Sequence, residues 1–200
     1  MSTADVSADI LAFWFGDASR DDVSYQARRK LWFRKSATFD KEVRQRFESV
    51  YRQAVAESWA RSPDRQAAPA DSLALTLLLD QLPRNMFRGS PAAFAADPQA
   101  QGVAKQAIAR GFDQALLPLQ RMFFYFPLEH SECGVDQQQA VDLFKTIAEQ
   151  APELSDAFDY ARRHQRVIDR FGRFPHRNPI LGRRSTPAEV TFLKQPGARF

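Results

Sequence analysis

The chain has 200 residues, 44% of them hydrophobic, and its 28 lysines and arginines exceed its 24 acidic residues by a net charge of +4. This length is ordinary for one domain, so we expect residues 1–200 to form a single domain. The small positive charge does not indicate a nucleic-acid partner. A lone cysteine, Cys133, excludes an internal disulfide and a cysteine-rich zinc site, which favours a reducing, cytoplasmic location.

Helical periodicity runs through most of the chain, and strand-like alternation is nearly absent. In chain order, the predicted helices cover 6–15, 25–33, 38–55 and 73–82, a short stretch from Pro91, and then 98–110, 119–126, 135–150, 152–171 and 187–193. A polar loop over 17–24 follows the first helix, and residues 61–70 form a surface connection. Counted without the shortest of these segments, about eight or nine helices with short loops predict an all-α fold of antiparallel helix pairs.

The ends of these helices carry recognisable residues. Starts are marked by Ser36 or Thr38, Asp71 or Ser72, Ser90-Pro91, Asp97-Pro98, Pro118, Pro152 and a capping box over Thr186–Glu189. Ends are marked by Gly16, Pro83, Gly111, Pro127 and Gly172. The helix over 73–82 is apolar nearly all round, which predicts that it is the central buried helix.

Neither an export signal nor a membrane span is visible. The N-terminus lacks a basic segment followed by an apolar one, and the apolar run around Leu77–Leu79 is far shorter than the roughly 18 residues of a spanning helix. We therefore expect no membrane partner.

Three stretches depart from amphipathic packing, namely 80–89, 126–132 and 170–183. Each follows an apolar helix and is expected to begin a loop at a proline or glycine, where clefts form. We predict that folding gathers them around one hollow. The candidate ligand-binding residues are Arg84, Asn85, Arg88, His130, Glu132, His164, Arg173, His176, Arg177 and Asn178.

The residue types in these stretches suit anion recognition or acid–base chemistry. Arginine presents a fork of donors that matches carboxylate and phosphate, and histidine titrates near neutral pH. Structural explanations stay open, since arginines also bond the last carbonyls of helices and asparagines also form turns. Glu129, His130 and Glu132 could form a metal or acid–base trio, but their spacing matches no strong metal signature. We expect no metal and no cofactor.

Five segments carry a family resemblance: 10–16, 31–33, 79–85 with 88–89, 127–132, and 170–178 with 181–183. In these segments the chain resembles a largely bacterial family catalogued as domain of unknown function 924. The resemblance implies an all-helical fold similar to tetratricopeptide-repeat superhelices. It implies no activity, substrate, cofactor or catalytic residue.

Three functions fit these observations. The first is a helical binding module whose cleft holds a small anion or an acidic peptide. The second is an enzyme acting on an anionic substrate held by the arginines, in which His130 or His176 is the general base and Glu132 orients the imidazole. The third, RNA binding through the basic stretch over 170–184, would rest on phosphate contacts that weaken with salt, and we expect none.

Overall fold

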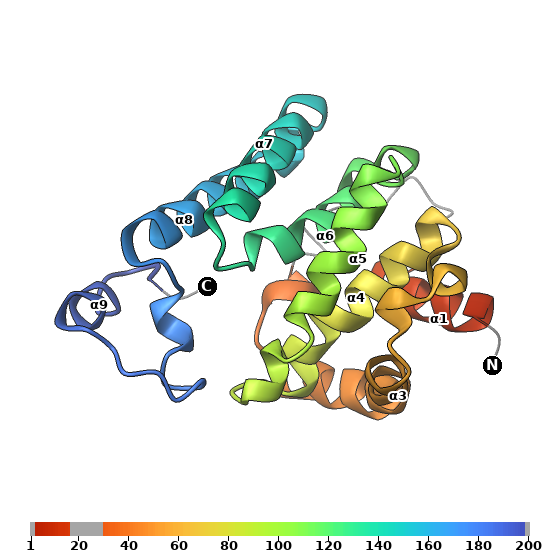
Figure 1. Ribbon diagram of the computed structural model, residues 1–200, viewed down its shortest axis with the longest axis horizontal. Coiled ribbons are helices and arrows are strands. Elements are labelled where there is room, and N and C mark those ends of the chain that lie inside the picture. The colour runs from red at the N-terminus through yellow and green to blue at the C-terminus, as the bar shows by residue number, and fades with distance from the viewer. Residues whose placement is uncertain (1–2, 17–29, 199–200) are drawn as a thin grey trace.

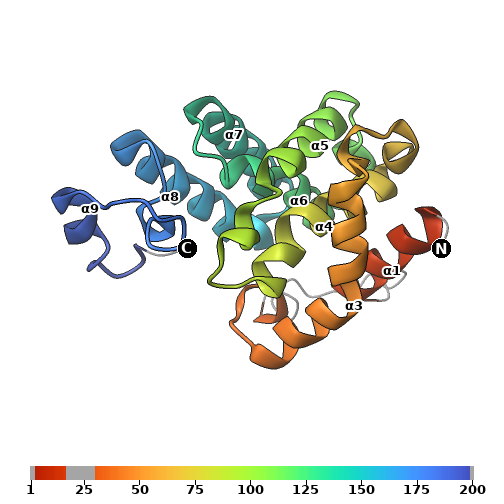
Figure 2. The same ribbon diagram turned by 60° about the horizontal axis from the view of Figure 1, so that its bottom comes forward.

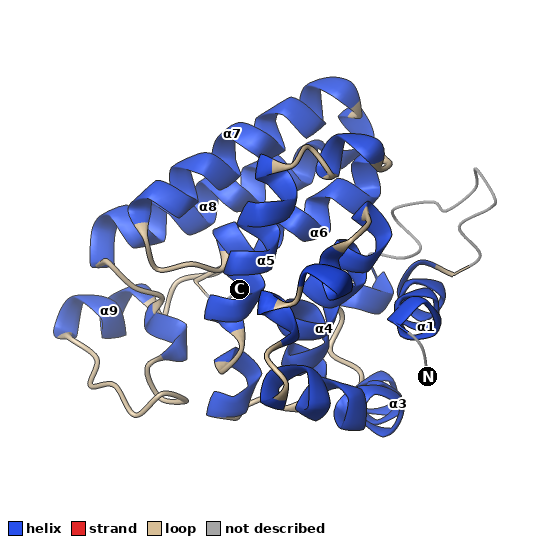
Figure 3. Ribbon diagram, turned by 45° about the vertical axis from the view of Figure 1, so that its right-hand side comes forward, coloured by secondary structure: helices blue, strands red, loops and turns tan. Residues whose placement is uncertain are grey.

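The computed structural model describes residues 3–16 and 30–198 (Figure 1). Within these ranges the chain forms helices joined by short loops and no strand (Figure 3), which confirms the all-α prediction. The α-helices are α1 (Thr3–Phe15), α3 (Ala37–Ala56), α4 (Pro69–Met86), α5 (Asp97–Ala109), α6 (Pro118–Glu129), α7 (Gly134–Gln150), α8 (Ser155–Phe171) and α9 (Pro187–Phe192). The 3-10 helices are η1 (Trp59–Arg61), η2 (Pro63–Gln66), η3 (Pro91–Phe94), η4 (Asp113–Ala115), η5 (Pro152–Leu154) and η6 (Pro175–Arg177).

Helix α4 is the centre of the molecule. It packs against α1, α3, α5 and α6, while α7 and α8 lie side by side beyond α6 (Figures 1 and 2). Residues 72–83 are buried without interruption, as the apolar sequence of this segment predicts. Helix α9 lies beyond α8, at the opposite end of the molecule from α1 and α3 (Figure 2).

An aromatic cluster joins α1, residues 30–33 and α6. The ring of Phe123 lies 4.9 Å from that of Trp32, 5.3 Å from that of Phe15 and 5.8 Å from that of Trp14, all edge-on. The indole N–H of Trp32 donates to the carbonyl of Trp14 at 3.0 Å. These rings bury a large apolar area, and edge-on contacts add further stabilisation.

Several predicted helix ends are confirmed. The Ser36 hydroxyl accepts from the Phe39 amide at the start of α3, and Thr186 and Glu189 form the capping box of α9. Gly16 and Gly172 follow α1 and α8 with φ of 75° and 66°, a left-handed conformation that costs glycine little.

The two predicted proline breaks are wrong. Helix α4 runs through Pro83 to Met86, and α6 runs through Pro127 to Glu129. Each proline lies in the last turns of its helix and is buried, so one backbone hydrogen bond is lost where packing holds the helix together. Arg84, Asn85 and Glu129 therefore project from rigid helices.

Other predicted boundaries shift by a few residues. Helix α4 begins at Pro69, before the expected caps at Asp71 and Ser72, and Pro91 starts only the 3-10 helix η3. Asp97 lies in the first turn of α5, and Ala96 occupies the capping position. Of the predicted helix over 25–33, residues 30–33 are helical; the rest, with the predicted loop over 17–24, lies outside the described residues. None of the described helices combines the length and apolar character needed to cross a membrane.

Candidate functional site

A cavity of about 340 Å³ lies where α4, α6 and α8 meet residues 32–33. This volume is within the range of small-molecule sites. Each helix contributes side chains spaced three, four or seven residues apart, which one helix face brings together. The lining residues are Trp32, Phe33, Gln81, Arg84, Asn85, Arg88, Met122, Phe126, Glu129, His130, Ala157, Tyr160 and His164.

Asp80 and His130 form a buried pair at this cavity. The imidazole Nδ1 lies 2.8 Å and 3.1 Å from the two carboxylate oxygens of Asp80, which is fully buried. The amide of Gln81 donates to the same carboxylate at 2.7 Å and Arg84 at 3.2 Å. Burial alone would raise the pKa of Asp80, but the neighbouring His130 and Arg84 outweigh it and hold this pKa below its usual range.

His130 is neutral at pH 7. Burial, with the nearby Arg84 charge, lowers the pKa of its imidazole below the ordinary value. A carboxylate can accept hydrogen bonds but cannot donate them. The single proton of the neutral ring therefore lies on Nδ1, facing Asp80. The other nitrogen, Nε2, therefore carries a lone pair, and it has no hydrogen-bond partner within the described part of the chain.

Glu129 is the second buried carboxyl group, and its pKa is shifted in the opposite direction from that of Asp80. Its Oε1 lies 3.1 Å from Nδ1 of His164, which also donates to the Tyr160 carbonyl at 3.0 Å. Burial raises the pKa of Glu129 well above its usual value, reinforced by the charge of Asp80, and burial lowers the pKa of His164 well below its own. Burial therefore favours the protonated form of the Glu129 carboxyl group beside the neutral form of the His164 imidazole. The buried Oε2 of Glu129 has no partner among the described residues.

Every arginine near the cavity is paired with an aspartate. Arg84 donates to Asp97 at 3.0 Å and 3.2 Å in addition to Asp80. Arg88 donates to Asp40 at 2.6 Å and 2.8 Å, and Asn85 donates to the same carboxylate at 2.8 Å. Because the guanidinium forks already hold carboxylates, the arginines act as supports for α4.

The structure brings five of the ten predicted ligand-binding residues into the cavity wall. These are Arg84, Asn85, Arg88, His130 and His164. The other five are Glu132, Arg173, His176, Arg177 and Asn178, which do not line it. The three predicted stretches therefore do not all line this cavity: the first two border it, and the third contacts Glu132, Asp97 and the ring of His164 instead.

The third stretch is held by its own ion pairs. Glu132 accepts from Arg183 at 2.7 Å and 2.9 Å and from the Phe174 amide at 2.7 Å. Phe174 is fully buried, with its ring 5.5 Å from that of His164. Glu132 thus anchors this stretch, and it does not orient His130 as the sequence suggested; Asp80 does.

The remaining predicted residues belong to the same support. Arg173 donates to Glu189 at 2.6 Å, and Asn178 donates to Ser185 at 3.1 Å. Arg177 lies 3.5 Å from Asp97, which connects this stretch to Arg84. The ring of His176 lies 5.7 Å from that of Phe174, and burial, reinforced by the Arg177 charge, lowers its pKa to about 4.

Glu129, His130 and Glu132 point to three different partners, although the sequence suggested them as a metal or acid–base trio. Glu129 faces His164, His130 faces Asp80, and Glu132 faces Arg183. Successive helix positions turn by about 100°, which separates neighbouring side chains. Within the described ranges, no three histidine, cysteine or carboxylate side chains are grouped closely enough to hold a metal ion.

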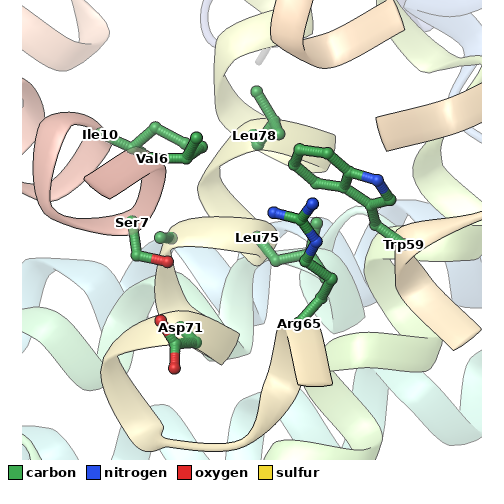
Figure 4. A pocket seen from close by; sticks show the side chains of 9 residues that line it. Val6, Ser7, Ile10, Trp59, Arg65, Asp71, Leu75 and Leu78 are labelled. Carbon is green, nitrogen blue, oxygen red and sulfur yellow. The ribbon is translucent and has the colours of Figure 1, made fainter. Parts of the chain in front are cut away.

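A smaller hollow lies between α1, η1, η2 and α4 (Figure 4). Its volume of about 10 Å³ is at most that of one water molecule. The guanidinium of Arg65 covers the Trp59 ring there, at 3.7 Å from the ring centroid. This hollow beside a cation–π contact is too small for a ligand, whereas the cavity between α4, α6 and α8 can hold one.

Three histidines with lowered pKa values make the free energy of unfolding depend on pH, so that the protein is less stable in acid. Below about pH 6.5 the histidines of the unfolded chain bind protons, whereas His130, His164 and His176 of the folded protein stay neutral to lower pH. We expect the free energy of unfolding to fall as the pH drops from 6.5 towards 4, by up to about 1.4 kcal/mol per pH unit for each histidine.

Glu129 opposes this trend, because its raised pKa keeps a proton on the folded state that the unfolded state loses above about pH 4.5. Urea unfolding at pH 7, 6 and 5 measures both effects. The Glu129→Gln variant should show a steeper loss on acidification than the wild type. A flat profile in both proteins would contradict these assignments.

The described helices and this cavity define an all-α protein with a partly enclosed hollow between α4, α6 and α8. A family model described as "Bacterial protein of unknown function (DUF924)" matches residues 10–197, so the chain belongs to this family. It is also similar to a solved structure of a protein of unknown function from Agrobacterium tumefaciens, with 39% identity and a TM-score of 0.80 over 96% of this chain and 99% of that one. No curated protein matches.

Proposed function

We propose that the protein is an acid–base enzyme acting on a small molecule in the central cavity, with His130 as the general base and Glu129 as the general acid. One observation carries the proposal: adjacent residues at the C-terminal end of α6 bring an imidazole nitrogen and a buried carboxyl oxygen, both without a partner among the described residues, to the same cavity. Acid–base sites typically contain two titratable groups whose surroundings shift their pKa values in opposite directions, so that one is protonated and the other is not.

The proposed chemistry is the transfer of a proton between two positions of the substrate. Nε2 of His130 removes a proton from one atom, while Oε2–H of Glu129 donates one to another. Asp80 holds the ring in the reactive tautomer and stabilises the imidazolium that forms. The reaction ends with His130 protonated and Glu129 ionised, and exchange with water restores both. Isomerisations and the addition or elimination of water follow this pattern.

The proposal is tested by turnover of a metabolite mixture. Wild-type protein and the His130→Gln variant are incubated with the mixture, and NMR or mass spectrometry records which compounds change. We expect His130→Gln to slow the wild-type conversion by at least about 100-fold, the usual contribution of a general base. The control is His176→Gln, which removes a histidine outside the cavity wall and should retain the rate. A wild-type protein that converts nothing, or a variant as fast as wild type, would overturn the proposal.

A module that binds a small anion or acidic peptide is the second candidate. Arg84, Asn85 and Arg88 in the cavity wall support it. The geometry supports it less, because Asp80, Asp97 and Asp40 already hold both guanidinium groups. An anion would have to compete with those carboxylates.

A further inference from the structure

The charges around the cavity cancel. Among the described residues, the three guanidinium groups of Arg84, Arg88 and Arg177 face the three carboxylates of Asp40, Asp80 and Asp97, in contacts of 2.6–3.5 Å. Lys35 also acts on Asp40, but it is exposed to solvent.

The titratable groups of the wall add no charge at pH 7. Burial raises the pKa of Glu129 and so favours its protonated form, and it lowers the pKa values of His130 and His164, which favours their neutral forms. A charged ligand would therefore find no unpaired counter-charge among these side chains. Burying an unpaired charge is far more costly than burying a neutral group.

Apart from Gln81 and Asn85, the remaining wall is mostly apolar and largely aromatic. The Phe126 ring stacks on His130, with centroids 5.9 Å apart and planes 14° from parallel. The ring of Phe33 stands edge-on to Phe126 at 5.8 Å. Trp32, Met122, Ala157 and Tyr160 complete this surface. A flat, apolar body gains most from such walls.

Only two polar features on the α6 side of the cavity lack a partner within the described part of the chain. Nε2 of His130 can accept a hydrogen bond, and the Glu129 carboxyl group, whose Oε2 has no partner among the described residues, donates one in its protonated form. A complementary ligand presents one donor and one acceptor. A hydroxyl, a carboxamide, or an enolisable carbonyl with its neighbouring C–H meets this requirement.

We infer that the substrate of this site is an uncharged molecule with a flat apolar body and a single hydroxyl, carbonyl or amide group. This inference rests on the proposed function, whose substrate class it names. It separates the enzyme from the anion-binding module, because the two make opposite predictions about ligand charge.

The test compares three probes of matched shape: naphthalene-2-carboxamide, naphthalene-2-carboxylate and 2-naphthylmethylamine. Their binding to the full chain at pH 7 is followed by titration calorimetry and by the methyl NMR signal of Met122, which lines the cavity; buried Met86 serves as the internal reference. We expect the carboxamide to bind and shift the Met122 signal, and both charged probes to bind at least about tenfold more weakly. Failure of the carboxamide to bind, or tighter binding of the carboxylate, would overturn the inference.

The Asp40→Asn variant tests the charge balance directly, because it leaves Arg88 without its carboxylate. We expect this variant to bind the carboxylate probe at least about fivefold more tightly than wild type, and the carboxamide within about twofold. The matched control, Asp64→Asn, removes an exposed carboxylate in η2 and should change neither affinity. Equal effects of the two variants on the carboxylate would contradict the inference.

The outcomes also distinguish this inference from the proposed function. Carboxamide binding alongside undiminished turnover in His130→Gln would retain the ligand class and reject the general base. Turnover that depends on His130 but acts on anionic compounds would do the opposite.

Discussion

The Asp80→Asn variant should lose about 3 kcal/mol of unfolding free energy at pH 7, one of the two largest effects expected in this protein. Asp80 is fully buried and accepts hydrogen bonds from His130, Gln81 and Arg84. An asparagine keeps the shape but removes the charge, so Arg84 retains only Asp97. Its amide also offers donors where acceptors are needed. Urea unfolding at pH 7 measures the loss.

Glu129→Gln is the matched comparison for this variant. Glu129 is also buried, at 2% exposure, but burial raises its pKa and favours the neutral acid, which an amide of nearly the same shape replaces. We expect this variant to be at least as stable as the wild type at pH 7, because folded Glu129 must keep a proton that the unfolded chain releases, and the amide avoids this cost. We thus predict that the two variants differ in their loss of unfolding free energy, although both carboxyl groups are buried. Equal losses in the two variants would show that burial, and not the ion pair, sets the cost.

The Phe123→Ala variant should lose about 4 kcal/mol, the second of these large effects. The Phe123 side chain has no exposed surface and contacts the rings of Trp14, Phe15, Trp32 and Phe126. Its removal leaves a cavity among large, rigid rings that cannot collapse to fill it. Thermal unfolding should show a drop of roughly 10 °C in Tm.

The control for Phe123→Ala is Leu117→Ala at the start of α6. Leu117 is 62% exposed, so we expect its truncation to change stability by no more than about 0.5 kcal/mol. Because Phe123 and Phe126 are neighbours in the core and Phe126 lines the cavity, Phe123→Ala should also weaken probe binding. A loss below about 1.5 kcal/mol would mean that the aromatic cluster rearranges to fill the void.

Much of the fold was predictable because helix signals are local. Ser36 and the Thr186–Glu189 box bond backbone amides within three residues, and a glycine at Gly172 ends a helix through its own conformation. Burial of 72–83 follows from a segment with no polar face. The prediction that helices end at Pro83 and Pro127 is wrong, because other helices pack on these last turns and hold them helical despite the proline.

The site was predictable only in part. Arg84, Asn85, Arg88, His130 and His164 line the cavity, whereas Tyr160 and Ala157, which also line it, resemble ordinary amphipathic positions of α8. The polar pair Asp80-Gln81 within a leucine-rich helix was the available signal for a buried site. The sequence indicates Glu129 only as one member of a metal or acid–base trio, whereas in the structure it lies in the cavity wall.

Local chemistry along the chain thus specifies where helices begin and end and which faces are apolar, because those properties depend on contacts within about four residues. The partner of each ionisable group depends on helices that meet across the fold. His130 faces Asp80, 50 positions away, although Glu132 is only two positions distant. Folding alone decides which carboxyl group is charged, since burial and neighbouring charges set its pKa.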